Sequence, residues 1–229
     1  MTVVDMFRSF QLKAKILDRT DLPTVWATDA VAILNNAQDQ IVDELIAARS
    51  YDLLRPITEA ISTTSGWDAY TGGINADGEG AQVNLRVVKL STLSVTASTV
   101  FRNYIRSQSE ITRTYAPVVT PAVAVANEEI TRELIGNFET NGTNFPIFTR
   151  PKAILEGDYL IVLGDYYTNI SKVVSVVVRS PKILHLVTNT GAYVSTCELP
   201  AYIHERIVDR AVQIYNSTVS IHDLTKKGS

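Results

Sequence analysis

Apolar residues recur with helical spacing in two long stretches, one near each end of the chain. In the C-terminal stretch the apolar side chains are spaced by four, four and three positions: Ile203, Ile207, Ala211 and Ile214. This spacing puts them on one face of a helix and leaves the charged residues on the other. Pro200 suits the first helical turn, where its missing N–H has no intrahelical partner. The stretch is predicted to be an amphipathic helix that packs on another element.

The second patterned stretch runs roughly from Thr24 to Ser50. Its apolar residues follow the same period: Trp26, Ala30, Ile33, Leu34, Ala37, Ile41, Leu45 and Ala48. Two apolar helix faces can bury each other, so we predict a terminal helix pair that closes a domain whose middle is inserted. Residues 3–19 also carry spaced apolar side chains and are predicted to form an opening helix or helical arm.

The middle of the chain has the β-branched content and alternation that are typical of strands. Val83 to Val100 predicts one or two strands, and Phe101 to Tyr115 predicts another strand or a long arm. Short β-rich runs separated by turn residues predict a small antiparallel sheet that leads into the last helix: Tyr159 to Leu163, Lys172 to Arg179, Ile183 to Val187 and Tyr193-Val194.

Two segments of the middle region depart from the strand pattern. Asn127 to Ile135 has an Asn cap, early acidic residues and a following Gly136, which together predict a short helix. Ser62 to Gln82 is rich in Gly, Ser, Thr and Asp without apolar periodicity and is predicted to be a long loop. Long loops in compact domains are usually functional or disordered, and Trp67 and Tyr70 favour a loop that orders by packing.

These elements predict an α+β fold. Its N-terminal helices and C-terminal helix pack together, with a small antiparallel sheet and long inserted loops or arms. Three segments are expected: an N-terminal helical part at 1–61, an inserted strand and loop region at 62–150, and C-terminal β-hairpins with the terminal helix at 151–229. The first and last segments are expected to form one core domain.

Composition narrows the classes of function. The 229 residues are 45% hydrophobic with a net charge of −3, which is typical of a soluble globular protein and argues against a dedicated nucleic-acid binder. The single cysteine, Cys197, excludes an intrachain disulfide and fits a reducing cytoplasm. No secretory signal begins the sequence, and no apolar run is long enough to span a membrane.

Motifs that would carry catalysis or metal binding are incomplete. His204-Glu205 begins like a zinc-protease helix, but Val208 stands where the second histidine belongs. The Gly-rich run from Asn75 to Gly80 resembles the start of a calcium loop, but it lacks the glutamate at the twelfth position. Phosphate-binding loops and nucleophile elbows do not occur, and Cys197 has no histidine signal beside it. The sequence therefore predicts no enzyme, cofactor or metal site, and favours a structural or interaction role.

Charge is distributed unevenly along the chain. Residues 21–59 contain seven acidic side chains against two basic ones, whereas residues 85–115 contain five basic ones against one acidic. One interpretation is two solvated faces, because exposed ion pairs contribute little. The other is complementary surfaces on adjacent copies that set the register of association. In that hypothesis the interface residues are Asp39, Asp43, Glu44, Arg86, Lys89, Arg102 and Arg106, with Trp67 and Tyr70 from the loop.

The two terminal regions also resemble a known family. LPTVWATDAVAILNNAQDQIVDELIAA and SPKILHLVTNTGAYVSTCELPAYIHERIVDRAVQIYN resemble the neck or head–tail connector subunits of crAss-like tailed bacteriophages. A Trp-led first helix and a terminal helix with the pattern L-P-x-x-x-H-E/R-x-I-V-x-x-A-V carry the resemblance. The matching residues are Trp26, Asn35, Asn36, Gln38, Leu199, Pro200, His204, Ile207, Val208, Ala211 and Val212.

The resemblance implies a virion protein that is assembled in the host bacterial cytoplasm. It implies a homo-oligomeric, dodecameric ring in the neck that contacts the portal and other neck or tail proteins. Genomic DNA would pass through such a ring without sequence-specific binding, and no membrane partner is implied. The alternative from another class is a ligand- or carbohydrate-binding phage appendage, in which Trp67, Tyr70, Tyr166 and Tyr167 provide stacking surfaces.

Overall fold

The chain folds into two compact units in the computed structural model, a helical unit and a β unit. The helical unit consists of Met1–Thr58 and Ser180–Ser229, and the β unit of Glu59–Arg179. The structure describes residues 1–14, 27–67, 83–93, 101–115, 118–119, 121–130, 150–165, 167–186 and 196–227. Strands 152–179, which the sequence analysis groups with the terminal helix, belong to the β unit.

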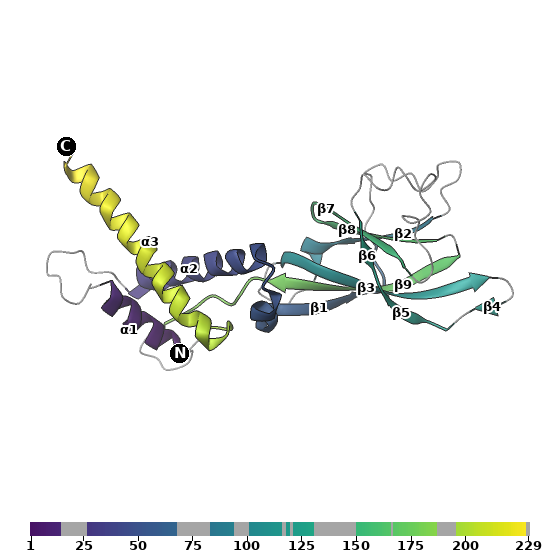
Figure 1. Cartoon of the computed structure of the whole chain (residues 1–229), viewed down its shortest axis with the longest axis horizontal. Helices are drawn as coiled ribbons and strands as arrows, with labels where there is room; N and C mark the ends of the chain where they lie inside the picture. Colours follow the sequence, from purple (N-terminus) through teal and green to yellow (C-terminus); the bar gives the residue numbers. More distant parts are fainter. Residues whose placement is uncertain are drawn as a thin grey trace. The chain divides into compact units, whose positions relative to one another are not determined.

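The helical unit is built from α1 (Val3–Lys13), α2 (Ala27–Ala47), the 3-10 helix η2 (Tyr51–Ile57) and α3 (Ala201–Lys227) (Figure 1). A capping box starts α1: the Thr2 hydroxyl accepts from Asp5 N at 3.1 Å, and Thr2 N donates to the Asp5 carboxylate at 3.0 Å. These bonds lower the pKa of Asp5. Helix α3 begins directly after Pro200, as the sequence predicts.

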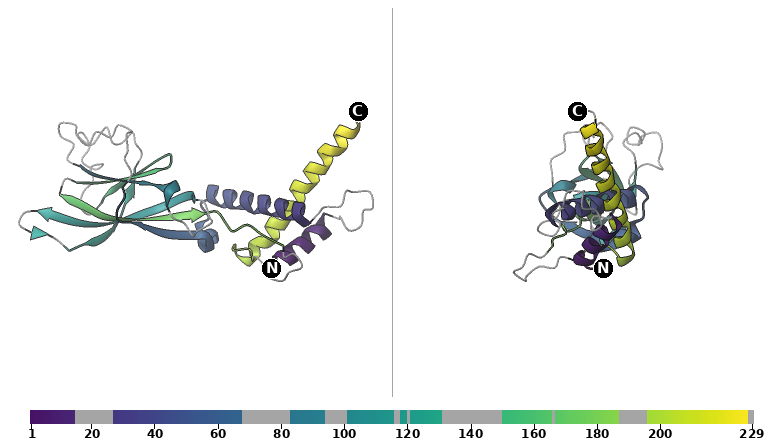
Figure 2. Two further views of the ribbon diagram at one scale, coloured as in Figure 1. Left: turned by 180° about the vertical axis from the view of Figure 1, so that it is seen from behind. Right: turned by 90° about the vertical axis from the view of Figure 1, so that its left-hand side faces the viewer.

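The three α-helices share one apolar core, which confirms the predicted packing of the terminal helices. Figure 2 shows α1, α2 and α3 from two further directions. Most residues of the predicted stripes are buried in this core together with side chains of α1: Val3, Met6, Phe10, Ala30, Leu34, Ala37, Ile41, Leu45, Ile203, Ile207 and Ala211. Of the other predicted members, Ile33 and Ile214 are half-buried and Ala48 is exposed. The rings of Phe10 and Tyr215 meet edge to face with centroids 5.9 Å apart. Trp26 lies outside the described residues.

The β unit contains two sheets. The first has the order β1-β9-β3-β4, with β5 also paired to β3, and the second has the order β2-β8-β7-β6. The paired strands whose registers are described run antiparallel except β6 and β7, which are parallel. The strands are β1 (Thr58–Thr63), β2 (Val83–Lys89), β3 (Phe101–Tyr115), β4 (Val118–Val119), β5 (Val123–Ala126), β6 (Glu128–Glu129), β7 (Lys152–Glu156), β8 (Tyr159–Asp165) and β9 (Thr168–Arg179).

The two sheets share a core because side chains from both meet in one cluster. It comprises Val88, Leu90, Tyr104, Ile111, Ala153, Leu160, Val162, Ile170 and Val173. A second cluster, of Val87, Ile154, Ile161 and Leu163, lies on the other face of the second sheet. Strand β8 is therefore buried on both faces, which explains why Tyr159 to Leu163 is a nearly continuous apolar run rather than an alternating one.

Two predicted elements differ from the structure. The predicted helix at Asn127–Ile135 is wrong over its described part, because Glu128 N donates to Pro151 O and Ile130 N to Ala153 O, which pairs β6 with β7. The rest of that segment lies outside the described residues. The predicted strand from Ile183 to Val187 is also wrong over its described part, 183–186, because residues 182–184 form hydrogen bonds with side chains of α2 instead of with a strand.

Those side chains are amides on α2. Asn35 accepts from Leu184 N at 2.7 Å and donates to Leu184 O at 3.1 Å, so it replaces a strand neighbour. Gln38 donates to Lys182 O at 3.1 Å and accepts from the Cys197 thiol at 3.3 Å. The backbone N–H and C=O groups of segment 182–184 that would pair with a neighbouring strand in a sheet instead bond to side chains of α2, and they fix the segment to that helix.

Candidate interaction surfaces

The acidic residues of the interface hypothesis lie together on α2 in the helical unit. Asp43 is exposed, and Asp39 and Glu44 are half-buried. The Glu44 carboxylate forms ion pairs with Arg206, at 3.6 Å, and with Arg210, both on α3. Glu44 therefore helps to join α2 to α3. Its charge is balanced within the unit.

A second ion-pair group joins α1 to α3. Lys13 Nζ lies 2.5 Å from the Glu205 carboxylate and 2.7 Å from the Asp209 carboxylate. The hydrogen bonds to Asp209 and Glu205 raise the pKa of Lys13. All three side chains are substantially exposed, so the contribution to stability is small. The predicted polar face of α3 is thus used partly for contacts between helices.

The basic residues of the hypothesis lie on β2 and β3 in the β unit. Arg86 donates to Ile170 O at 3.2 Å and to Leu85 O at 3.1 Å, and its guanidinium lies 5.6 Å from the centre of the Trp67 ring. Lys89 Nζ lies 5.8 Å from the centre of the Tyr159 ring. Trp67, Arg86 and Lys89 therefore have contacts inside the unit. Tyr70 lies outside the described residues.

Arg102 and Arg106 lie on the long strand β3. Arg102 is half-buried and Arg106 is exposed. Arg106 is directly opposite Val176 of β9, and the bulges before and after it shift the register of the two strands. Among the residues of the interface hypothesis that the structure describes, Arg106 and Asp43 are the most exposed.

Arg106 belongs to an open face of the first sheet, formed by β9, β3 and β5. Directly opposite residues of paired strands share a face, and the register gives three rows here: Val176 and Arg106; Val174, Gln108 and Ala126; Lys172, Glu110 and Ala124. All eight side chains are exposed or half-buried. We call these eight residues the open sheet face. The alternate rows, which contain Ser107, Ser109 and Val173, are buried against the other sheet.

The charge imbalance along the sequence does not extend to the two units. The helical unit carries eleven Lys and Arg against twelve Asp and Glu, a net charge of −1. The β unit carries the remaining ten against twelve, a net charge of −2. Any electrostatic complementarity between copies must therefore be local, at single exposed side chains such as Asp43 and Arg106, rather than a property of whole units.

A groove lies in the β unit beside the end of β1. It has a volume of about 300 Å³, and most of its lining side chains are hydroxyls. The lining residues are Ile61, Ser62, Thr63, Thr64, Ser65, Gly66, Val88, Lys89, Thr92 and Leu93. Of the four aromatic residues proposed for glycan stacking, the structure describes Trp67 and Tyr167. Trp67 comes directly after the groove residue Gly66 in the sequence, but its ring contacts the Arg86 guanidinium. Tyr167 is in the turn between β8 and β9.

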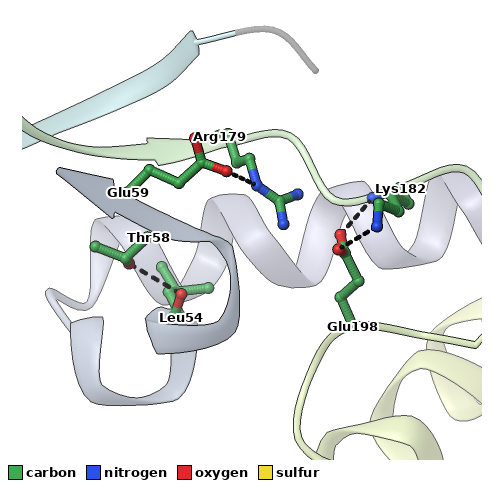
Figure 3. A network of polar contacts seen from close by, with 6 residues as sticks. All are labelled: Leu54, Thr58, Glu59, Arg179, Lys182 and Glu198. Atoms are coloured by element: carbon green, nitrogen blue, oxygen red, sulfur yellow. Dashed lines mark hydrogen bonds and ion pairs between the residues drawn. The ribbon is translucent and has the colours of Figure 1, made fainter. Parts of the chain in front are cut away.

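Two buried cations in the β unit were not anticipated from the sequence. The Lys152 side chain is 2% exposed and its ammonium lies 2.7 Å from the Glu128 carboxylate, which lowers the pKa of Glu128. The Arg179 side chain on β9 is 7% exposed, and its Nε donates to Glu59 of β1 at 2.7 Å (Figure 3). Each cation lies at a strand end and pairs with an acid on another strand, so removal of either acid would take away the paired charge of a buried cation and destabilise the sheet.

The chain segment that enters α3 is held by its own polar contacts. Glu198 accepts from Lys182 N at 2.9 Å, and its other oxygen lies 3.3 Å from Lys182 Nζ (Figure 3). Figure 3 also shows the hydroxyl of Thr58, which donates to Leu54 O at 2.9 Å at the end of η2. All of these groups serve the local fold of the helical unit.

Cys197 and His204 are the remaining candidates for a nucleophile and a metal ligand. Cys197 is buried, and burial raises the pKa of its thiol, which disfavours the nucleophilic thiolate. His204 is also buried, and its Nε2 lies 2.8 Å from Leu199 O. In the part of the chain that the structure describes, His, Cys, Asp and Glu side chains form no cluster of three or more that is suited to a metal ion.

Within the described ranges, no helix has both the length and the apolar content to cross a membrane. Comparison with protein-family models and with curated proteins finds no match.

Proposed function

We propose that this protein is a structural virion protein of a tailed phage. In this proposal it forms an oligomeric ring in the neck between portal and tail and lines the DNA passage. The resemblance of the two terminal regions to crAss-like phage connector subunits supports the proposal. The observation that carries it is the open sheet face, which suits a contact between neighbouring subunits.

The composition of the open sheet face favours a protein partner. Ala124, Ala126, Val174 and Val176 are small or β-branched side chains that let another surface approach closely, and Arg106 lies beside them. Arginine is enriched in protein interfaces, where its stem packs and its guanidinium forms hydrogen bonds. If this face meets a different face of the next subunit, the contact is heterologous, and it closes into a ring when the rotation divides the circle.

Exposed acids on α2 are the complementary group in this proposal. Asp43 is exposed and the half-buried Asp39 lies one helical turn before it, and in this proposal these two acids meet Arg106 of the next copy. Because both units carry only small net charges, the attraction acts at short range and sets register rather than long-range steering.

Charge reversal on β3 tests the proposal. The double variant R102E/R106E is expected to lower the ring population, because like charges would then meet across the interface. Light scattering and negative-stain electron microscopy measure the population, and circular dichroism checks that the fold survives, since Arg106 is exposed and Arg102 is half-buried rather than in the core. Wild-type rings should also weaken as salt shortens the Debye length from about 10 Å at 0.1 M to about 3 Å at 1 M.

The matched control is R8E/R55E, which makes the same charge change at two exposed arginines of the helical unit. It should assemble like the wild type. If R102E/R106E forms rings as readily as the control across the salt range, Arg102 and Arg106 lie outside the interface. A wild-type protein that stays monomeric at every concentration would contradict the ring itself.

The alternative, a carbohydrate-binding appendage, has one observation in its favour. The groove beside β1 is lined by hydroxyls, with Lys89 as its cation, and polar groups of this kind can bind sugars. One observation argues against this alternative: the face of the Trp67 ring that would stack on a sugar is in contact with the Arg86 guanidinium. Chemical-shift changes at Thr63, Thr64 and Ser65 on addition of host surface glycans would favour this alternative.

A further inference from the structure

The core between the two sheets contains an unusual group of polar side chains. Ser107 and Ser175 are directly opposite each other on β3 and β9, and Ser109 is two residues further along β3 on the same face. All three are buried. Asn127, which connects β5 of the first sheet to β6 of the second, completes the group. We call these four residues the buried serine cluster.

Asn127 is fixed to this place by two hydrogen bonds to one residue. Its backbone N donates to Ser107 O at 3.1 Å, and its side-chain Nδ2 donates to Ser107 Oγ at 2.8 Å. The Tyr104 hydroxyl also donates to Ser107 Oγ, at 3.0 Å. Hydroxyl groups both donate and accept, so Ser107 has its partners in Asn127 and Tyr104.

Three further atoms of the cluster have no partner among the described residues. Ser109 Oγ, Ser175 Oγ and Asn127 Oδ1 are all buried and form no hydrogen bond with any group that the structure describes. Buried polar atoms are nearly always hydrogen-bonded, to protein or to ordered water. These three atoms, two hydroxyl oxygens and one amide oxygen, provide both donors and acceptors.

We propose that the buried serine cluster is a binding site for internal water. Ser109 and Ser175 are diagonal neighbours on β3 and β9, where Cβ atoms are typically about 7–8 Å apart, and two Oγ atoms that turn toward each other lie closer than that. A water molecule that hydrogen-bonds at about 2.8 Å to each of two oxygens spans such a gap. Internal waters typically make about three hydrogen bonds to buried polar groups, which Ser109, Ser175 and Asn127 can supply.

The place of the site in the fold gives the water a structural role. It lies where the chain crosses from the first sheet to the second at Asn127, so it completes the polar contacts that hold this crossing. The alternate row on the same strands forms the open sheet face, so the water supports that face from inside. The site lies within one chain and does not depend on ring formation, so it can be tested with either the monomer or the assembled protein.

The test combines wild-type structure with alanine variants. A high-resolution crystal structure should show ordered water within hydrogen-bonding distance of Ser109 Oγ and Ser175 Oγ, and NMR should show long-lived contacts between water and the amides of these residues. In S109A/S175A those water contacts should disappear and the melting temperature should fall, because bonds to the water are lost. The control S62A, at an exposed position of β1, should leave both unchanged.

Two results would overturn the proposal. If the wild-type hydroxyls bond to backbone carbonyls without ordered water, the site does not exist. If S109A/S175A melts at a higher temperature than the wild type, the hydroxyls were unpaired and their removal relieved a desolvation cost, which is the opposite sign. The wild-type measurements decide the question even if the double variant fails to fold.

Discussion

Replacing Ile207 by Asp is expected to unfold the helical unit or to leave it barely stable. Ile207 is 0% exposed and lies in the core that α3 shares with α1 and α2. An aspartate there would bury a carboxylate without a partner and would also remove an apolar side chain. Such changes cost more than about 4 kcal/mol, against a total stability of about 5–15 kcal/mol for a typical domain. Urea unfolding followed by circular dichroism measures the loss.

The matched control for this variant is Tyr202→Asp on the same helix. Tyr202 is 62% exposed and lies in the first turn of α3, where a carboxylate is favoured by the helix dipole. It should change the unfolding midpoint little. If I207D unfolds at the same urea concentration as Y202D, the buried face of α3 does not hold the terminal helices together, and the core described for the helical unit is incorrect.

The helical unit was the part of the fold that the sequence predicted best. Long stretches with a 3.6-residue period depend mainly on local spacing, so the stripes on α2 and α3 could be assigned without knowledge of their neighbours. The short segment at Ile183 could not, because its β-branched and apolar content is typical of a strand, while Asn35 and Gln38 of α2 take its backbone hydrogen bonds. Nothing near Ile183 in the sequence indicates those distant amides.

In the β unit, too, the local sequence does not predict which strands pair. The run Phe101–Tyr115 was identified as a strand or an arm, but its partner β9 is more than fifty residues away, and the bulges that set its register have no sequence signal. At Asn127–Ile135, the Asn cap and early acids indicated a helix, whereas pairing of Glu128 with Lys152 overrides that local preference. Tertiary contacts decided these elements.

The sequence alone does not show which candidate interface residues have contacts inside the protein and which are exposed. Trp67 is a candidate because it lies in the long loop and Arg86 because residues 85–115 carry a basic excess, but the two side chains contact each other. Glu44 is a candidate because residues 21–59 carry an acidic excess, although Glu44 pairs with α3. Arg106 keeps its place as a candidate because the pairing of β3 with β9 and β5 leaves its row exposed.

Alkaline pH is expected to destabilise the β unit through Tyr104. Its side chain is 6% exposed, and burial raises its pKa to about 12, with the charge of Glu129 acting in the same direction and the Ser107 hydroxyl opposing it. The unfolded chain releases this proton near pH 10, whereas the folded chain retains it. The stabilisation is therefore complete below pH 10 and is lost as pH rises to 12. Two pH units correspond to about 2.7 kcal/mol.

Comparison with Tyr104→Phe isolates this effect from other groups that titrate in the same range, such as lysines. The free energy of unfolding should fall more steeply between pH 10 and 12 in the wild type than in Y104F, with urea unfolding at each pH as the measurement. Below pH 9 the difference between the two proteins should be constant, because the tyrosine is then protonated in both the folded and the unfolded chain. Parallel curves up to pH 12 would mean that Tyr104 ionises as easily in the fold as in the unfolded chain, so the core around Ser107 would have to be open to solvent.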